Sequence, residues 1–251
     1  MRLLARFKTL LAMTVAVAGI GSRLDAGIIT TVPAGLNPGD KYRLVFVTSA
    51  TWGAVSPDIG FYNAYVESLA DATPGLQALG ATWKAIGSTE SVNAFDNIGA
   101  SPSTVGIYRL DGEKVANGTA ALFGTQVVEL LLAPIDITEG GVVSGDTWAW
   151  TGSGADGGAL DNRQLGKDFP EAGFIHDRQF WLNRDAISAE AALTFYAISS
   201  EITVGGDAQT VPEPGSVGLT TLGGAILLFA TRRKRKDSLA IQPDRTAPEH
   251  H

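Results

Sequence analysis

The stretch of this chain that says most about its fold is Tyr42-Arg43-Leu44-Val45-Phe46-Val47-Thr48. Its β-branched and aromatic residues suit the pleated, largely buried surface of a sheet. The turn-forming run Asn37-Pro38-Gly39-Asp40 stands just before it, and such residues mark the ends of strands because their backbones accept turn geometry. The sequence therefore predicts a strand over 42–48.

A helix is expected soon after this strand. The run Ser56-Pro57-Asp58 offers an N-cap residue, a proline for the first helical position and an acid for the first turn. The apolar residues beyond it are spaced by three, four and three positions and so share one helical face: Ile59, Tyr62, Val66 and Leu69. Thr73-Pro74-Gly75 interrupts this pattern, and residues 76–80 predict one further helical turn closed by its glycine.

The rest of the chain predicts short strands and loops. Residues 107–110 and 194–198 are rich in strand-forming side chains, and Asp111-Gly112 lies at a predicted tight turn. One early helix followed by many short strands indicates an α+β fold.

Composition excludes several classes of site. The chain has 251 residues, which fits one or two domains, and 45% of them are apolar, enough for a core. It contains no cysteine, so no disulfide, thiolate metal site or cysteine nucleophile is available. The net charge of −7 argues against nucleic acid as a partner, because such binding rests on Lys and Arg releasing phosphate counterions.

The amino-terminal end has the pattern of a secretory signal peptide. Cations at Arg2, Arg6 and Lys8 precede an apolar run over 9–20, and small residues follow up to Ala26. We expect residues 1–26 to be removed on export, with cleavage near Ala26. A hydrophobic first helix of the domain is the alternative.

The carboxyl-terminal end combines three features in order. The motif Val211-Pro212-Glu213-Pro214 is followed by an uncharged stretch over 215–231, whose length is near the short limit for crossing a bilayer. Five consecutive cations then form a predicted stop-transfer cluster: Arg232, Arg233, Lys234, Arg235 and Lys236. This order predicts a single transmembrane helix with a cytoplasmic basic end, and a buried helix of a soluble core is the alternative.

This three-part end resembles the PEP-CTERM sorting signal of Gram-negative bacteria, over residues 211–236. The resemblance implies that an exosortase recognises Pro212, Glu213 and Pro214 and processes the exported chain. The tail over 237–251, expected to be cytoplasmic, departs from that pattern, because such signals usually end within a few residues of the cations.

The segment between the two signals, 27–210, is the predicted exported domain. It holds nine Lys or Arg against 21 Asp or Glu, a net charge of −12. Four stretches, 82–85, 106–116, 133–139 and 148–157, resemble bacterial surface domains of unassigned function related to the endostatin-like branch of the C-type-lectin-like fold. The resemblance implies a C-type-lectin-like α+β fold. Relatives often carry a cysteine pair that this chain lacks, and the triplets that bind calcium and sugar in true C-type lectins are also missing, so only the fold carries over.

Two groups of residues are candidates for ligand binding. Trp148, Trp150 and Trp181 could stack on sugar rings or fill the core. Asp156 and Asp161 lie on a Gly-rich loop that could offer oxygen ligands to calcium. Their spacing matches no known calcium loop, however, and a solvated loop is the alternative, so we expect no cofactor.

His176 is the one histidine of the predicted domain, and no nucleophile elbow or zinc-protease motif accompanies it. We therefore expect an exposed loop histidine and assign no catalytic residue. Together these patterns predict an exported cell-surface or extracellular-matrix protein, sorted by an exosortase at the inner membrane. Its predicted role is non-enzymatic and either structural or binding, with polysaccharide as a possible partner. The alternative is an extracellular hydrolase that cleaves carbohydrate with a carboxylate pair.

Overall fold

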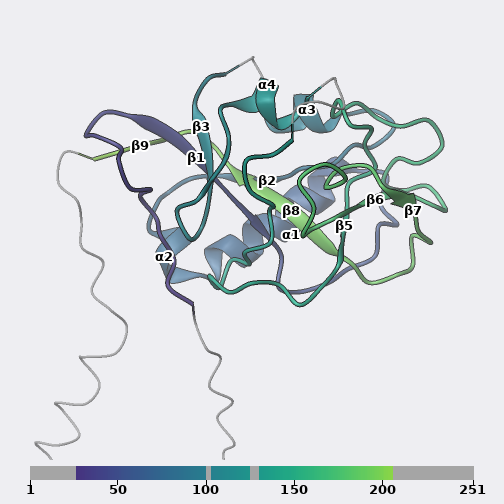
Figure 1. Cartoon of the computed structure of the whole chain (residues 1–251). Helices are drawn as coiled ribbons and strands as arrows, with labels where there is room; N and C mark the ends of the chain where they lie inside the picture. The colour runs from purple at the N-terminus through teal and green to yellow at the C-terminus, as the bar shows by residue number, and fades with distance from the viewer. Residues whose placement is uncertain (1–26, 100–102, 125–129, 206–251) are drawn as a thin grey trace, which may run out of the picture. The chain divides into compact units, whose positions relative to one another are not determined.

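The computed structural model describes residues 27–99, 103–124 and 130–205 (Figure 1). Its strands are β1 (Lys41–Val47), β2 (Trp83–Ala85), β3 (Gly106–Arg109), β4 (Lys114–Ala116), β5 (Trp148–Trp150), β6 (Glu171–Phe174), β7 (Asp185–Ala186), β8 (Thr194–Ser199) and β9 (Ile202–Thr203). Its helices are α1 (Ile59–Asp71), α2 (Pro74–Gln77), α3 (Ala94–Asn97) and α4 (Thr119–Leu122). Except for β1, α1 and β8, these elements are four residues long or shorter, so loops carry much of the surface.

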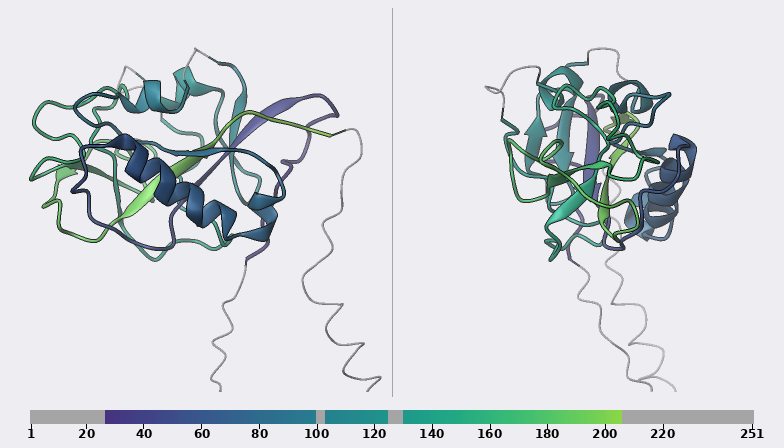
Figure 2. Two further views of the ribbon diagram at one scale, coloured as in Figure 1. Left: turned by 180° about the vertical axis from the view of Figure 1, so that it is seen from behind. Right: turned by 90° about the vertical axis from the view of Figure 1, so that its right-hand side faces the viewer.

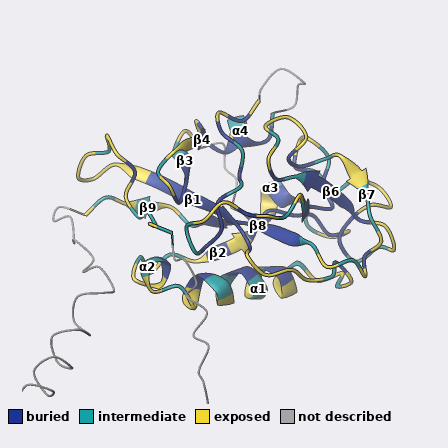
Figure 3. Ribbon diagram, turned by 60° about the horizontal axis from the view of Figure 1, so that its bottom comes forward, coloured by how far each residue is buried: buried dark blue, intermediate teal, exposed yellow. Residues whose placement is uncertain are grey.

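The strands form one mixed sheet in the order β4-β3-β1-β8-β5-β6-β7, with β2 also paired to β8 and β9 to β1. β1 pairs with β3 in parallel and with β8 antiparallel. β5 joins the sheet by pairing with β8 in parallel. The two halves of the sheet therefore meet at β1 and β8, whose side chains are almost all buried (Figure 3).

β1 is buried because both faces of the sheet are covered. Tyr42, Leu44 and Phe46 belong to the hydrophobic cluster that contains the buried residues of α1, whereas Val45 and Val47 belong to a second cluster. Alternate residues of a strand point to opposite faces, so a continuous apolar run is what a doubly covered strand requires. Figure 2 shows α1 against one face of the sheet and loops over the other.

α1 begins two residues later than the sequence predicts, because its N-cap is Asp58 and not Ser56. The Asp58 carboxylate accepts a hydrogen bond of 2.8 Å from the Gly60 backbone N–H, which satisfies a donor that the first helical turn leaves free. Tyr62, Val66 and Ala70 form its buried face, at the spacing expected of a helix that packs one side on a sheet.

The fold class expected from the sequence was wrong. A C-type-lectin-like domain with one early helix was predicted, and the described residues instead form a nine-stranded mixed sheet with four helices, three of them only four residues long. Both parallel pairings, β1 with β3 and β5 with β8, join segments far apart in the sequence. The hydrophobic pattern within a strand carries no information about such partners.

The expected transmembrane helix is corrected as well. None of the helices in the described part of the chain is both long and apolar enough to span a bilayer. The longest, α1, has 13 residues, or about 20 Å at 1.5 Å per residue, against a hydrocarbon core of about 30 Å. The single-pass anchored localisation therefore finds no support. The segments on which it was based, 1–26, 211–236 and 237–251, lie outside the described residues.

Candidate functional site

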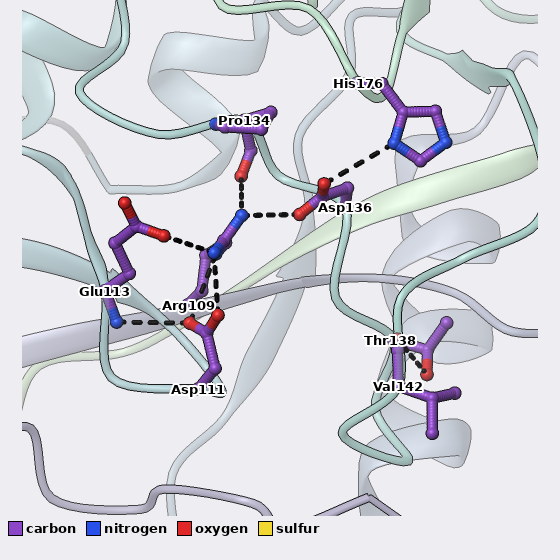
Figure 4. Close-up of polar contacts among 8 residues, drawn as sticks. All are labelled: Arg109, Asp111, Glu113, Pro134, Asp136, Thr138, Val142 and His176. Atoms are coloured by element: carbon purple, nitrogen blue, oxygen red, sulfur yellow. Dashed lines mark hydrogen bonds and ion pairs between the residues drawn. The ribbon is translucent and has the colours of Figure 1, made fainter.

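The most strongly charged site in the structure surrounds Arg109, the last residue of β3, which is only 8% exposed. Its guanidinium contacts three carboxylates (Figure 4). Asp111 receives hydrogen bonds of 3.1 and 2.7 Å from Nε and Nη2, and Asp136 receives one of 2.6 Å from Nη1. Nη2 also donates to Glu113, and Nη1 to the carbonyl oxygen of Pro134 at 3.2 Å. We call this set the Arg109 network.

The Arg109 network joins the β3–β4 turn to the segment around Asp136. Burial acts to lower the pKa of Arg109, but the hydrogen bond and charge of Asp111, with the charges of Asp136 and Glu113, raise the pKa overall. The guanidinium thus stays charged, and each contact is a charge-assisted hydrogen bond, the strongest kind in proteins. This arrangement is suited to holding two loops together, because the carboxylates it gathers are already bound to a cation.

His176 lies at the edge of this network. Its Nδ1 is 3.4 Å from the second carboxylate oxygen of Asp136 (Figure 4). Its Nε2 is 3.0 Å from the carbonyl oxygen of Asp146. The histidine is exposed on a loop, as the sequence predicts. Both ring nitrogens face acceptors of the protein itself, so neither is directed at a hydroxyl that it could activate.

The three candidate tryptophans lie in different surroundings. Trp150 is completely buried and Trp181 is 5% exposed, and both belong to the hydrophobic clusters. Trp148 is partly exposed, and its ring stacks on Phe174 of the neighbouring strand with centroids 4.1 Å apart. Of the predicted sugar-stacking residues, Trp148 alone is therefore partly exposed, and it also packs against the first hydrophobic cluster.

An arginine extends the aromatic surface at Trp148. The Arg184 guanidinium lies over the Phe174 ring at 5.5 Å and over the Phe180 ring at 4.8 Å. Phe180 is itself 37% exposed. We call Trp148, Phe174, Phe180 and Arg184 the aromatic platform. It lies along β5 and β6 and the loop that leads to β7.

The Gly-rich loop with Asp156 and Asp161 shows no metal-like geometry. The Asp156 carboxylate accepts a hydrogen bond of 2.9 Å from the Gly158 backbone N–H, which is an ordinary loop contact. Asp161 is exposed. Across the described residues, no three acidic or histidine side chains are grouped as a metal ion would need.

The sequence patterns did not indicate a second polar site, which lies after β1. The backbone N–H and the hydroxyl of Ser49, just after β1, both donate to the buried carboxylate of Glu139, the first at 2.8 Å. Glu139 lies on a turn that Thr138 closes by donating to the Val142 carbonyl from its N–H at 2.8 Å and its hydroxyl at 3.1 Å (Figure 4). The available signal was a polar run, Thr48-Ser49-Ala50-Thr51, ending in Trp52 directly after a buried strand.

The predicted sorting motif and stop-transfer cluster cannot be placed in this description. Val211, Pro212, Glu213 and Pro214, and the cations over 232–236, lie outside the described residues. No protein-family model matches the chain, and no curated protein matches its sequence. The resemblance to a PEP-CTERM sorting signal therefore stays a prediction, whereas the C-type-lectin-like fold is contradicted by the nine-stranded mixed sheet.

Proposed function

We propose that this chain is a non-enzymatic surface or matrix protein whose folded domain binds polysaccharide through the aromatic platform. The observation that carries the proposal is the partly exposed ring of Trp148, stacked on Phe174 beside the Arg184 guanidinium. Aromatic faces offer a flat apolar surface to the C–H face of a sugar, and a neighbouring polar group fixes its orientation.

Arg184 supplies the polar group. Its guanidinium forms none of the ion pairs found among the described residues, and two aromatic rings hold it in place. An arginine has five N–H donors in a fixed planar arrangement, so a restrained Arg184 loses little further freedom when it donates to sugar hydroxyls or carboxylates.

The state of the acidic residues favours binding over hydrolysis by a carboxylate pair. The acids that the structure brings together, Asp111, Glu113 and Asp136, all contact Arg109. All three are thus engaged by one guanidinium, whereas a glycoside hydrolase needs two carboxyl groups that face the scissile bond.

The test is a glycan array probed with the full chain, followed by turnover assays on each polysaccharide retained. We expect retention without turnover, and a loss of retention in Phe180→Ala and in Arg184→Ala. Phe169→Ala is the matched control, since Phe169 is also an exposed phenylalanine but lies outside the platform. Turnover of a retained polysaccharide, or equal retention by all three variants, would refute the proposal.

The sorting role forms a separate part of the proposal, and it is supported by the sequence motif alone. We propose that an exosortase processes the chain at Val211-Pro212-Glu213-Pro214. In a host that has the enzyme, replacing Pro212, Glu213 and Pro214 with alanine should abolish the truncated product seen by mass spectrometry. Unchanged truncation in that variant would contradict the sorting role and leave the binding role untouched.

A further inference from the structure

The cations of the segment 27–210 differ in what surrounds them. The segment holds nine Lys or Arg against 21 Asp or Glu, so acids outnumber cations by more than two to one. Eight of these cations have a protein oxygen atom within hydrogen-bond distance. The ninth is Arg184, which is exposed. Among the described residues, its guanidinium takes part in no ion pair. The one cation without a carboxylate in an acidic domain therefore belongs to the aromatic platform.

Two acidic residues close to Arg184 in the chain bind backbone groups instead. The Asp185 carboxylate accepts a hydrogen bond of 2.8 Å from the Ala186 N–H. The Asp177 carboxylate accepts hydrogen bonds of 2.6 and 3.0 Å from the N–H groups of Gln179 and Phe180. Such local contacts engage a carboxylate with the chain next to it. Neither acid forms an ion pair with Arg184, so the guanidinium is open to an anion from outside the chain.

Rings and backbone hydrogen bonds hold Arg184 in place. Its backbone N–H donates to the Ala172 carbonyl at 3.0 Å, and the Phe174 N–H donates to the Phe180 carbonyl at 2.9 Å. The guanidinium lies over the Phe174 and Phe180 rings, which attract its charge. These residues lie at the end of the sheet formed by β5, β6 and β7 (Figure 1). A cation positioned in this way loses little freedom on binding.

We infer that the aromatic platform selects an acidic polysaccharide in which uronic acid units alternate with neutral sugars. The inference rests on the proposed function, because it names the class of polysaccharide that the same platform binds. The planar carboxylate of a uronic acid matches the N–H donors of the Arg184 guanidinium, which can bind both of its oxygens. The neighbouring neutral sugar covers the exposed parts of Trp148 and Phe180.

The acidity of the domain explains why the acidic units should alternate with neutral ones. The net charge of −12 over 27–210 repels a polyanion, and this repulsion extends about 8 Å at physiological ionic strength. A polymer with a carboxylate on every sugar brings several charges to the acidic surface, yet only one of them meets Arg184. A polymer with alternating charges keeps the favourable contact and reduces the repulsion.

The test is calorimetric titration of the full chain with a hyaluronan octasaccharide, in which glucuronate alternates with an uncharged amino sugar. The carboxyl-reduced octasaccharide, which has the same backbone without charge, should bind at least about tenfold more weakly. An octasaccharide of polygalacturonate should bind a few-fold more weakly than hyaluronan, because every unit is charged. Equal binding of the carboxyl-reduced form would overturn the inference. Tighter binding of polygalacturonate, or of a dextran sulfate of the same length, would also overturn it, since charge density would then decide the affinity.

Three variants assign the selectivity to Arg184. Arg184→Gln should make the charged and the carboxyl-reduced octasaccharides bind equally, and it should fold as the parent chain does because the side chain is exposed. Phe180→Ala should weaken both by a similar factor and keep their ratio, since stacking does not depend on the carboxylate. Lys41→Gln is the matched control, because Lys41 is an exposed cation on β1 with its own partner, Glu201. A tenfold preference that persists in Arg184→Gln would refute the inference.

The inference and the proposed function fail in different ways. If the glycan array retains only neutral polysaccharides and Phe180→Ala abolishes their retention, the platform binds sugar and the selectivity for acidic units is wrong. If the array retains no polysaccharide, both are wrong.

Discussion

Two buried charges lie on neighbouring parts of this fold and differ in the partners that surround them. Arg109 meets three carboxylates, among them Asp136. Glu139, three residues beyond Asp136 in the chain, receives hydrogen bonds from Ser49 and takes part in none of the ion pairs among the described residues. A buried charge with a full set of partners serves the architecture, because its contacts join loops and its removal leaves other charges in a low dielectric. A buried charge that has only hydrogen bonds keeps more of its desolvation cost. The difference separates an ion-paired site that stabilises the fold from one whose charge costs stability.

The largest effect is expected from removing the paired charge. Arg109→Met should lower the free energy of unfolding by about 3 kcal/mol, because it leaves Asp136 largely buried without a cation. Urea denaturation at neutral pH measures the loss. Lys41→Met breaks the exposed pair with Glu201 and should cost less than about 1 kcal/mol. Equal losses in the two variants would mean that burial does not distinguish the two ion pairs.

Alkaline pH tests a buried hydroxyl that both donates and accepts a hydrogen bond in its neutral form. The Tyr62 hydroxyl donates to the Ser56 carbonyl at 2.7 Å and accepts from the Ser56 N–H at 2.8 Å. Burial raises the pKa of Tyr62 to about 12, although its hydrogen bond to the Ser56 backbone acts to lower it. The folded state therefore holds the proton more tightly than the unfolded state does.

The sign of the pH effect follows from that difference. The contribution of Tyr62 is complete below its unfolded pKa of about 10 and is lost as the pH rises toward its folded value. The loss by about pH 12 is on the order of 2 kcal/mol. In Tyr62→Phe, the free energy of unfolding obtained from denaturation curves should depend less on pH across this range. If it depends on pH as strongly as in the parent chain, Tyr62 is excluded as the source of the effect.

One substitution can leave Glu171 as a buried carboxylate without an ion-pair partner, as Glu139 is among the described residues. Arg163→Met removes the cation from Glu171, which then stays buried without a partner. We expect a loss of about 1.5 kcal/mol, less than at Arg109 because Arg163 itself is about half exposed. The added change Glu171→Gln should restore most of that loss in the double variant. Absence of any restoration would indicate that the charge of Glu171 is not the cause.

The smallest expected effect is an increase in the free energy of unfolding, not a decrease. Glu139→Gln should raise the free energy of unfolding by about 1 kcal/mol, because the amide keeps an acceptor for Ser49 without the cost of an unpaired charge. The same change at Glu171 should lower it, since that charge has a partner. Destabilisation by Glu139→Gln would mean that the charge of Glu139 stabilises the fold through its hydrogen bonds with Ser49.

Local elements of this protein could be predicted because their causes lie within a few residues. The predicted apolar positions Tyr62 and Val66 form the buried face of α1, although its N-cap is Asp58 and not the predicted Ser56. The strand predicted over 42–48 forms at Lys41–Val47. Side-chain periodicity and capping are properties of the nearby sequence, so they survive whatever the rest of the chain does.

The functional candidates were less accessible to sequence reasoning. Trp148, Trp150 and Trp181 share a residue type, yet only Trp148 keeps part of its ring in solvent. The exposure of each ring depends on which residues pack over it, and those residues come from distant segments of the chain. Ser49 and Glu139 are 90 residues apart in the chain, so no spacing rule could have brought them together.

The sequence by itself determined that a helix follows β1 with Tyr62 and Val66 on its buried face, the apolar character of β1 and the acidity of the domain. Only the tertiary structure decided that β1 pairs in parallel with β3, that Arg109 collects Asp111, Glu113 and Asp136, and that none of the ion pairs among the described residues includes Glu139. The physical reason is the separation in sequence over which each kind of interaction acts. Helix caps and periodicity act between residues a few positions apart, whereas strand pairing and the compensation of buried charge depend on which distant segments the folded chain places in contact.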